Sequence, residues 1–239
     1  MPPILENTEH PLRIGGFVPL STTDYPGELA AVVFLQGCPW RCSYCHNPHL
    51  IAPDGPVTHA WSDILLWLER RRSLLDAVLF SGGEPTLQQG LAEAMRAVRA
   101  LGFKVGLHTS GAYPKQLRAV LPFCNWVGLD MKASYAQYDA LTGVPGSAQR
   151  VRDSLAALVM SGVAHECRTT VHPKLHTLQE LQVMAQEVLL AGAECYVLQP
   201  FRVEGCRDSA LVEAADQLAT AMLLKHTARL SPGVLTRSV

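Results

Sequence analysis

The sequence has few charged residues for its length and no long run of a single charge sign. Charged residues make up 17% of its 239 positions and the formal net charge is -1, while the longest basic run is only 70–72. Proteins that bind nucleic acid carry clustered basic residues, so we do not expect that function. Charges such as Glu69 and Glu93 also interrupt the apolar stretches, so we expect no membrane span.

The first residues lack the apolar core of a signal peptide. Residues 1–12 carry Glu6, Glu9 and three prolines instead. We therefore expect a cytoplasmic protein, where thiols stay reduced. Apolar residues still make up 48% of the chain, enough for one large α/β domain. We expect that single domain to span 1–239, with a core over about 14–205 and a C-terminal helix over 209–227.

Seven cysteines are present, and three of them are closely spaced. Cys38, Cys42 and Cys45 lie four and three positions apart. At a cysteine frequency of about 0.03, chance would give about 0.006 such triplets in a chain of this size. The odd total and the scatter of the others argue against a disulfide framework. We expect those others to be ordinary small apolar residues or incidental thiols; they are Cys124, Cys167, Cys195 and Cys206.

Strand-like and helix-like segments alternate along the chain in six units, after a short strand over 14–20. Such alternation predicts a parallel sheet with right-handed crossovers. The tail beyond 227 is expected to be irregular. We expect strands over 30–35, 76–80, 103–107, 126–129, 166–171 and 195–198, and helices over 59–72, 87–101, 115–121, 134–141, 148–160, 178–190 and 209–227.

Polar sequences follow or close each of the six strands. Because the carboxyl ends of parallel strands gather at one edge, six polar endings in a row predict one site at the mouth of a barrel. The sequences are CPWRCSYC (38–45), SGGEP (81–85), HTSG (108–111), DMK (130–132), RTTVHP (168–173) and QPFR (199–202).

The cysteine triplet supports two kinds of metal site. Three thiolates can hold three irons of a four-iron cluster and leave the fourth iron open to a small molecule. Alternatively, His46 or His49 could complete a structural zinc site, although such sites usually pair two close ligands with two distant ones.

CPWRCSYC resembles the CxxxCxxC motif of the radical S-adenosylmethionine superfamily, in which an aromatic residue commonly precedes the last cysteine, as Tyr44 does here. SGGEP resembles that superfamily's glycine-rich stretch. The run STTDYPGELAAVVFLQGCPWRCSYCHNP (21–48) is similar to activating enzymes of glycyl-radical proteins, above all to those of anaerobic ribonucleoside-triphosphate reductase. The resemblance implies a partial (β/α)6 barrel, in agreement with the six units.

The resemblance also implies an activity. A [4Fe–4S] cluster, reduced by flavodoxin or ferredoxin, would cleave S-adenosylmethionine to a 5′-deoxyadenosyl radical. That radical would take a hydrogen atom from a backbone glycine of a partner, here anaerobic ribonucleotide reductase. No inserted cysteine quartet lies between His46 and Leu79, so one cluster is expected. DYPG (24–27) stands where pyruvate formate-lyase activators carry DGPG, which favours the reductase branch.

The resemblance further implies which residues would bind the cofactors. Cys38, Cys42 and Cys45 would ligate the cluster, and Tyr44 and His46 would lie beside the adenine. Gly82, Gly83 and Glu84 would meet the methionine amino group, and Lys132 would pair with the methionine carboxylate. Asp130 would meet a ribose or a cation. Further contacts would come from Thr109, Ser110, Arg168 and Arg202.

Other interpretations stay open at this point. Asp130 and Lys132 could form a solvated pair, while Arg168 and Arg202 could be structural ion-pair partners. The chain could instead be a small-molecule radical enzyme similar to 7-carboxy-7-deazaguanine synthase. A zinc-bound module without catalytic activity is the remaining alternative.

Overall fold

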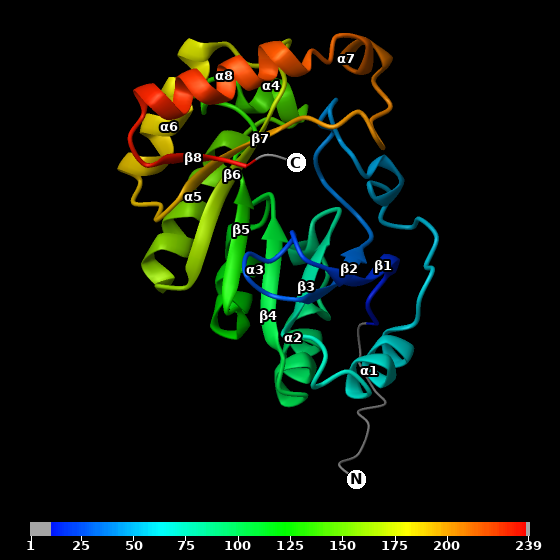
Figure 1. The fold of residues 1–239 in the computed structure, drawn as a ribbon. Helices are drawn as coiled ribbons and strands as arrows, with labels where there is room; N and C mark the ends of the chain where they lie inside the picture. Colours follow the sequence, from blue (N-terminus) through cyan, green and yellow to red (C-terminus); the bar gives the residue numbers. More distant parts are fainter. Residues whose placement is uncertain (1–10, 238–239) are drawn as a thin grey trace.

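The computed structural model describes residues 11–237, and its frame is one eight-stranded sheet. The strands follow one another in sequence order. The first pair is antiparallel and all later neighbours are parallel, so the sheet curves as an open barrel with six strands of (β/α) type at its centre (Figure 1). The strands are β1 (Ile14–Ser21), β2 (Ala30–Leu35), β3 (Ala77–Gly82), β4 (Lys104–Thr109), β5 (Trp126–Asp130), β6 (Ala164–Val171), β7 (Tyr196–Pro200) and β8 (Val234–Thr236).

Helices connect the parallel strands, and the predicted partial (β/α)6 barrel is confirmed. The arrows of β4 and β5 point to the top of Figure 1, where the loops after the strands gather. Three short 3-10 turns lie at 48–50, 85–87 and 121–123. The helices are α1 (Trp61–Glu69), α2 (Leu91–Ala100), α3 (Pro114–Val120), α4 (Tyr138–Thr142), α5 (Ser147–Ser161), α6 (Leu178–Leu190), α7 (Ser209–Glu213) and α8 (Gln217–Leu230).

The C-terminal part differs from the sequence prediction. A continuous helix over 209–227 is wrong, because the chain breaks after Glu213 and starts a new helix behind Asp216, whose Oδ1 accepts from Ala219 N at 2.9 Å. The tail is not irregular either, since α8 continues to Leu230 and β8 pairs with β7.

Other helix starts were predicted too early. The segment 87–101 starts on the last residue of the 3-10 turn 85–87 and becomes α2 only at Leu91. The segment 134–141 becomes α4 only at Tyr138. Residues 1–10 and 238–239 lie outside the described part of the chain. The predictions of a 1–239 domain and of a missing signal peptide therefore stay predictions.

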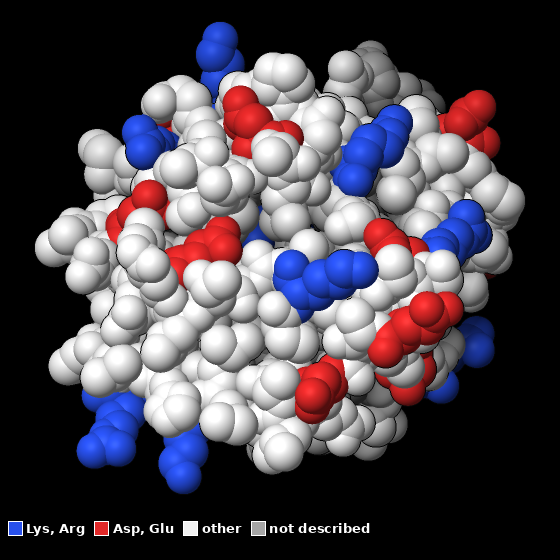
Figure 2. All heavy atoms as spheres, turned by 90° about the horizontal axis from the view of Figure 1, so that it is seen from above, with Lys and Arg blue, Asp and Glu red and all other residues white. Residues whose placement is uncertain are grey.

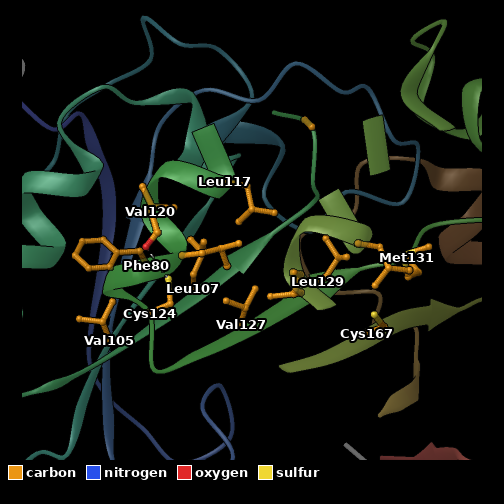
Figure 3. Packing of buried hydrophobic residues seen from close by; sticks show 14 of the residues in the cluster. Phe80, Val105, Leu107, Leu117, Val120, Cys124, Val127, Leu129, Met131 and Cys167 are labelled. Carbon is orange, nitrogen blue, oxygen red and sulfur yellow. Dashed lines mark hydrogen bonds between the residues drawn. The ribbon is translucent and has the colours of Figure 1, made fainter. Parts of the chain in front are cut away.

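The sheet buries a different core on each face. Residues of the outer face, such as Phe80, Leu107 and Val127, pack against Leu117 and Val120 of α3 (Figure 3). This large core includes the buried Cys124 and Cys167, as expected for small apolar residues.

The inner face is filled by the turn between β1 and β2. Tyr25 from that turn stacks on Trp126 of β5 with ring centroids 5.1 Å apart. A Cβ on Gly106 of β4 would lie 2.8 Å from the Tyr25 ring, so glycine is needed where the ring crosses the strand. The inner cluster also contains Val32 and Leu79. Within residues 11–237, no helix combines the length and apolar character that crossing a membrane requires.

Candidate active site

The cysteine loop leaves the carboxyl end of β2 and is tied down by backbone hydrogen bonds. Cys38 N donates to Ile51 O at 3.0 Å, and Cys45 N donates to Cys42 O at 3.2 Å in a tight turn. All three cysteines of the motif are partly exposed and free of disulfide bonds. The loop therefore presents three thiols from one short, folded segment.

Burial disfavours the negatively charged thiolate form of these cysteines unless a cation lies nearby. It raises the pKa of Cys38 to about 12 and also raises that of Cys42, although the nearby Lys132 opposes both shifts. Three thiolates there need a strongly positive partner, which the irons of a cluster supply. The donor set thus fits a cluster with three cysteine ligands.

A single zinc ion makes a stricter geometric demand on the same loop. Zinc needs its ligands to converge on a single point at distances of about 2.0–2.3 Å. Within residues 11–237, no group of three or more His, Cys, Asp or Glu side chains is arranged to hold one metal ion. This holds for the motif cysteines with His46 or His49, and equally for the three motif cysteines among themselves.

The glycine-rich end of β3 lies directly against the cysteine loop. Gly82 has a φ of +123°, in the region that favours glycine. A Cβ on Gly83 would lie 2.3 Å from Gly37 O, which is a backbone atom and cannot move aside easily. Glu84 N also donates to Gly37 O at 2.8 Å. Only glycine permits this close approach of two backbones, so the Gly82–Gly83 turn, called the glycine cradle below, packs directly on the cysteine loop.

Glu84 is fully buried, with 0% of its surface exposed. Its Oε1 accepts from Thr109 Oγ1 at 2.8 Å and also from both the backbone N–H and the hydroxyl of Thr86. Its Oε2 accepts from Ser110 N at 2.7 Å and from the Ser110 hydroxyl. The structure thus brings Glu84, Thr109 and Ser110 together as one network.

Asp130, the last residue of β5, lies between Lys132, two positions further on, and Arg168 within β6. Its Oδ1 accepts from Arg168 Nη2 at 2.9 Å, and its Oδ2 lies 3.6 Å from Lys132 Nζ. Burial alone would raise the pKa of Asp130, but Arg168 and Lys132 outweigh burial and lower it. The Lys132 ammonium also lies 5.7 Å from the centre of the Tyr44 ring. Asp130 and Lys132 therefore form a charged pair next to the cysteine loop.

His108 is a member of this network that sequence reasoning missed. Its Nε2 lies 2.8 Å from Arg168 Nη1 and 2.9 Å from Asp24 O. The Arg168 guanidinium can only donate and the Asp24 carbonyl can only accept, so the neutral imidazole satisfies one of the two through Nε2 in each tautomer. Its Nδ1 lies 3.4 Å from Ser81 Oγ. Burial and the charge of Arg168 lower the pKa of His108 to about 3. His108 therefore buttresses Arg168 as an uncharged base.

The loop 201–208 after β7 closes over the cysteine loop from the other side of the mouth. His46 stacks on Phe201 with ring centroids 5.3 Å apart, and its Nε2 lies 2.9 Å from Arg202 O. A Cβ on Gly205 would lie 2.2 Å from His46 O, and the Cys206 thiol donates to Ser43 O at 3.7 Å. Figure 1 shows this orange loop beside the blue segment that follows β2.

The two expected arginine contacts fall in different places. Arg168 is buried at the Asp130 carboxylate, whereas the Arg202 side chain is exposed and only its carbonyl reaches His46. The sequence QPFR (199–202) marked the neighbourhood of Phe201 but not its stacking on His46, and no sequence signal pointed to Cys206. The partners of both residues lie more than 150 positions away.

A groove of about 720 Å³ opens beside the cysteine loop. Viewed from above, the face where the strands end carries scattered charges of both signs and no continuous patch of either (Figure 2). Loop and helix residues line the groove, among them Arg41, Ser43, Gln137, Leu141, Thr177 and Glu180.

Comparisons with known proteins identify relatives of the chain. The family model described as "Radical SAM superfamily" matches residues 32–188. A candidate glycyl-radical enzyme activating enzyme of Methanocaldococcus jannaschii is 28% identical over 205 residues, which are 82% of this chain and 82% of that protein. The pyruvate formate-lyase-activating enzyme of Clostridium pasteurianum is 30% identical over 174 residues, which are 70% of this chain and 72% of that protein.

A solved structure also shares the fold. Streptococcus suis SuiB bound to S-adenosylmethionine aligns with a TM-score of 0.64 at 11% identity. The alignment covers 84% of this chain and 48% of that protein, so the chain spans about half of its length. At this identity the likeness concerns the fold alone.

Proposed function

The chain belongs to the radical S-adenosylmethionine superfamily, and we propose that it is a glycyl-radical enzyme activating enzyme whose partner is an anaerobic ribonucleoside-triphosphate reductase. Its cofactors are one [4Fe–4S] cluster and S-adenosylmethionine. The observation that supports the proposed cofactor site is the contact between the cysteine loop and the Gly82–Gly83 turn. The choice of partner rests on the sequence resemblance alone.

The proposed roles follow from position. Cys38, Cys42 and Cys45 would hold the cluster. The Lys132 ammonium lies near Cys42 and over the aromatic ring of Tyr44. When bound, the cluster and S-adenosylmethionine supply a one-electron reduction that splits the cofactor into methionine and a 5′-deoxyadenosyl radical.

The remaining residues would bind and orient the cofactor. Lys132 suits the methionine carboxylate, because its ammonium is held beside Asp130 at the mouth. Gly82 and Gly83, which carry no side chain, would meet the amino group through their backbone. His46, fixed by its stacking on Phe201, would lie beside the adenine. Asp130 would meet a ribose or a cation, although Arg168 already occupies one of its oxygens.

The choice of partner rests on the sequence DYPG (24–27). In the structure, this turn fills the inner face of the barrel, where Tyr25 stacks on Trp126 and Asp24 O lies beside His108. The turn is therefore packed inside the barrel. The preference for a reductase comes from the resemblance of these four residues to the activating enzymes of anaerobic ribonucleoside-triphosphate reductase. A single 1–239 domain, a cytoplasmic setting and electron delivery by flavodoxin or ferredoxin belong to the same proposal.

The partner is tested by forming the radical directly. The reduced protein is mixed anaerobically with S-adenosylmethionine and an anaerobic ribonucleoside-triphosphate reductase, and the mixture is examined by electron paramagnetic resonance. We expect a glycyl-radical doublet that disappears when the reductase glycine is replaced by alanine. A doublet formed only on pyruvate formate-lyase would refute this choice of partner. Turnover of a small substrate without any partner would refute the activating function.

A further inference from the structure

The carboxylate of Glu84 has no room left for a ligand. A carboxylate offers about four lone-pair positions, and five protein donors already point at this one. The side chain is also completely shielded from solvent. A direct contact with the methionine amino group, as the sequence resemblance implies, would require one of these donors to leave.

The donors come from two separate elements of the mouth. Thr86 belongs to the 3-10 turn that follows Glu84, while Thr109 and Ser110 form the end of β4. At the same time, the backbone N–H of Glu84 holds Gly37 O in front of the first cysteine. One residue thus joins the loops that follow β2, β3 and β4.

We propose that Glu84 is a positioning residue, whose carboxylate fixes the Gly82–Gly83 cradle against the cysteine loop and the end of β4 without touching the cofactor. Buried acceptors with several charge-assisted hydrogen bonds hold their neighbours rigidly. The cradle has no side chains of its own. Backbone hydrogen bonds of Gly83 N to Leu35 O and of Glu84 N to Gly37 O hold it on the β2 side, and the Glu84 carboxylate ties it to the end of β4. The inference rests on S-adenosylmethionine as the cofactor and not on the identity of the partner.

A variant of Thr86 distinguishes a positioning role of Glu84 from a direct contact of Glu84 with the cofactor. Its hydroxyl donates to Glu84, it is 2% exposed, and the resemblance assigns it no contact with the cofactor. The variant Thr86→Val removes that donor and keeps the side-chain shape. If Glu84 acts by positioning, we expect the dissociation constant for S-adenosylmethionine to rise by about three- to tenfold, up to the scale of one hydrogen bond to a charged group. Thr86→Ser keeps the hydroxyl and should restore the wild-type value.

The experiment measures binding and a spectrum, not turnover. Anaerobically reconstituted wild type, Thr86→Val and Glu84→Gln are titrated with S-adenosylmethionine, and iron content and thermal unfolding are recorded for each. We expect the paramagnetic spectrum of the reduced cluster at saturating cofactor to be the same in all three, because none of the changes removes a group that touches the cofactor. Thr227→Val, which removes a buried hydroxyl of α8 bonded to Leu223 O, is the matched control and should bind normally.

Wild-type affinity in Thr86→Val would overturn the inference, whether or not Glu84→Gln binds. An altered saturated spectrum in Glu84→Gln with an unchanged one in Thr86→Val would also overturn it, because it would indicate direct contact. Should Glu84→Gln fail to fold, the pair of Thr86 variants still decides the matter. Failure to form a glycyl radical on any partner would leave these measurements unaffected.

Discussion

Arg168 Nη2 lies 2.9 Å from Asp130 Oδ1, across two strands that are directly paired in the sheet. The remaining Arg168 nitrogen Nη1 faces His108, and the second Asp130 oxygen faces Lys132. The guanidinium itself fits because residue 128 is glycine, where a Cβ would lie 2.9 Å from Arg168 Cζ. A continuous row of charged and polar groups therefore crosses the inner face of the barrel and ends at the proposed carboxylate ligand.

Removing Arg168 should therefore disturb both stability and cofactor binding. Arg168→Met leaves Asp130 with Lys132 as its only cationic partner in this row. We expect unfolding free energy to fall by about 1–3 kcal/mol, less than for a fully buried pair because the Asp130 side chain is 36% exposed. The measurement is chemical denaturation at neutral pH. The double variant Arg168→Met with Asp130→Asn should recover part of the loss, and a purely additive result would contradict the pairing.

The depressed pKa of His108 predicts a loss of stability in mild acid. The imidazole has a folded pKa of about 3, whereas an unfolded histidine titrates near 6.5. Below pH about 6.5, His108 binds a proton in the unfolded chain but not in the folded protein, so stability falls as the pH decreases toward 3. Above that range His108 contributes no pH dependence.

The variant His108→Gln removes this titration. Between pH about 7 and 5, the slope of its unfolding free energy against pH should be smaller than that of the wild type by an amount that corresponds to the uptake of close to one proton. Thermal unfolding across that range, in wild type and variant, provides the comparison. Parallel profiles would mean that His108 binds a proton in the folded state, contrary to its position beside Arg168.

Gly83 should be far less tolerant of a methyl group than Gly16. Gly83→Ala would place a Cβ 2.3 Å from Gly37 O, whereas Gly16→Ala would make ordinary contacts of at least 3.5 Å with Phe34. We expect Gly83→Ala to cost about 1–3 kcal/mol, because backbone must shift, and to abolish binding of S-adenosylmethionine. Gly16→Ala should fold and bind normally. Calorimetric titration of both reconstituted variants tests this, and normal binding by Gly83→Ala would contradict the cradle.

Gly205 tests the loop 201–208 that closes over the cysteines. Gly205 and Gly146 both have positive φ, so alanine strains the backbone similarly at the two sites. Only at Gly205 would the Cβ meet another segment, 2.2 Å from His46 O, while nothing lies within 4 Å at Gly146. We expect Gly205→Ala to lose iron faster in air than Gly146→Ala, measured by bleaching of the visible absorbance. Equal rates would show that the loop does not protect the cysteines.

Local patterns predicted the scaffold well. The apolar run of β2 and the period of α6 gave their bounds without error, since each pattern reflects burial of the element itself. The break after Glu213 escaped notice because apolar residues continue on both sides. Its signal was Asp216, a side chain that caps the next helix three residues on.

The site was predictable as a set of strand ends but not as a set of contacts. Counting by two along β4 and β5 places His108 beyond Gly106, and Asp130 beyond Gly128, on the inner face. That count could have identified His108. The partners of Glu84 could not be found this way, because three loops meet there only after the barrel has formed.

Cysteine substitutions test the cluster ligands. Cys42→Ala should lose iron and the brown colour, because a four-iron cluster held by three cysteines retains only two. Cys195→Ala should keep both, since Cys195 precedes β7, where its ionisable neighbours are Glu166, Arg237 and Glu194 and not the motif cysteines. Iron and sulfide analysis after anaerobic reconstitution measures the difference. A Cys42→Ala protein with full iron content would contradict the ligand assignment.

The most direct test of the account is the cleavage of S-adenosylmethionine by the reduced protein. Anaerobically reconstituted wild type is treated with a one-electron reductant and the cofactor, and 5′-deoxyadenosine is quantified by chromatography. The account predicts release of 5′-deoxyadenosine with methionine in equal amounts, and none from Cys42→Ala. A wild-type protein with an intact, reduced cluster that never releases 5′-deoxyadenosine would contradict it.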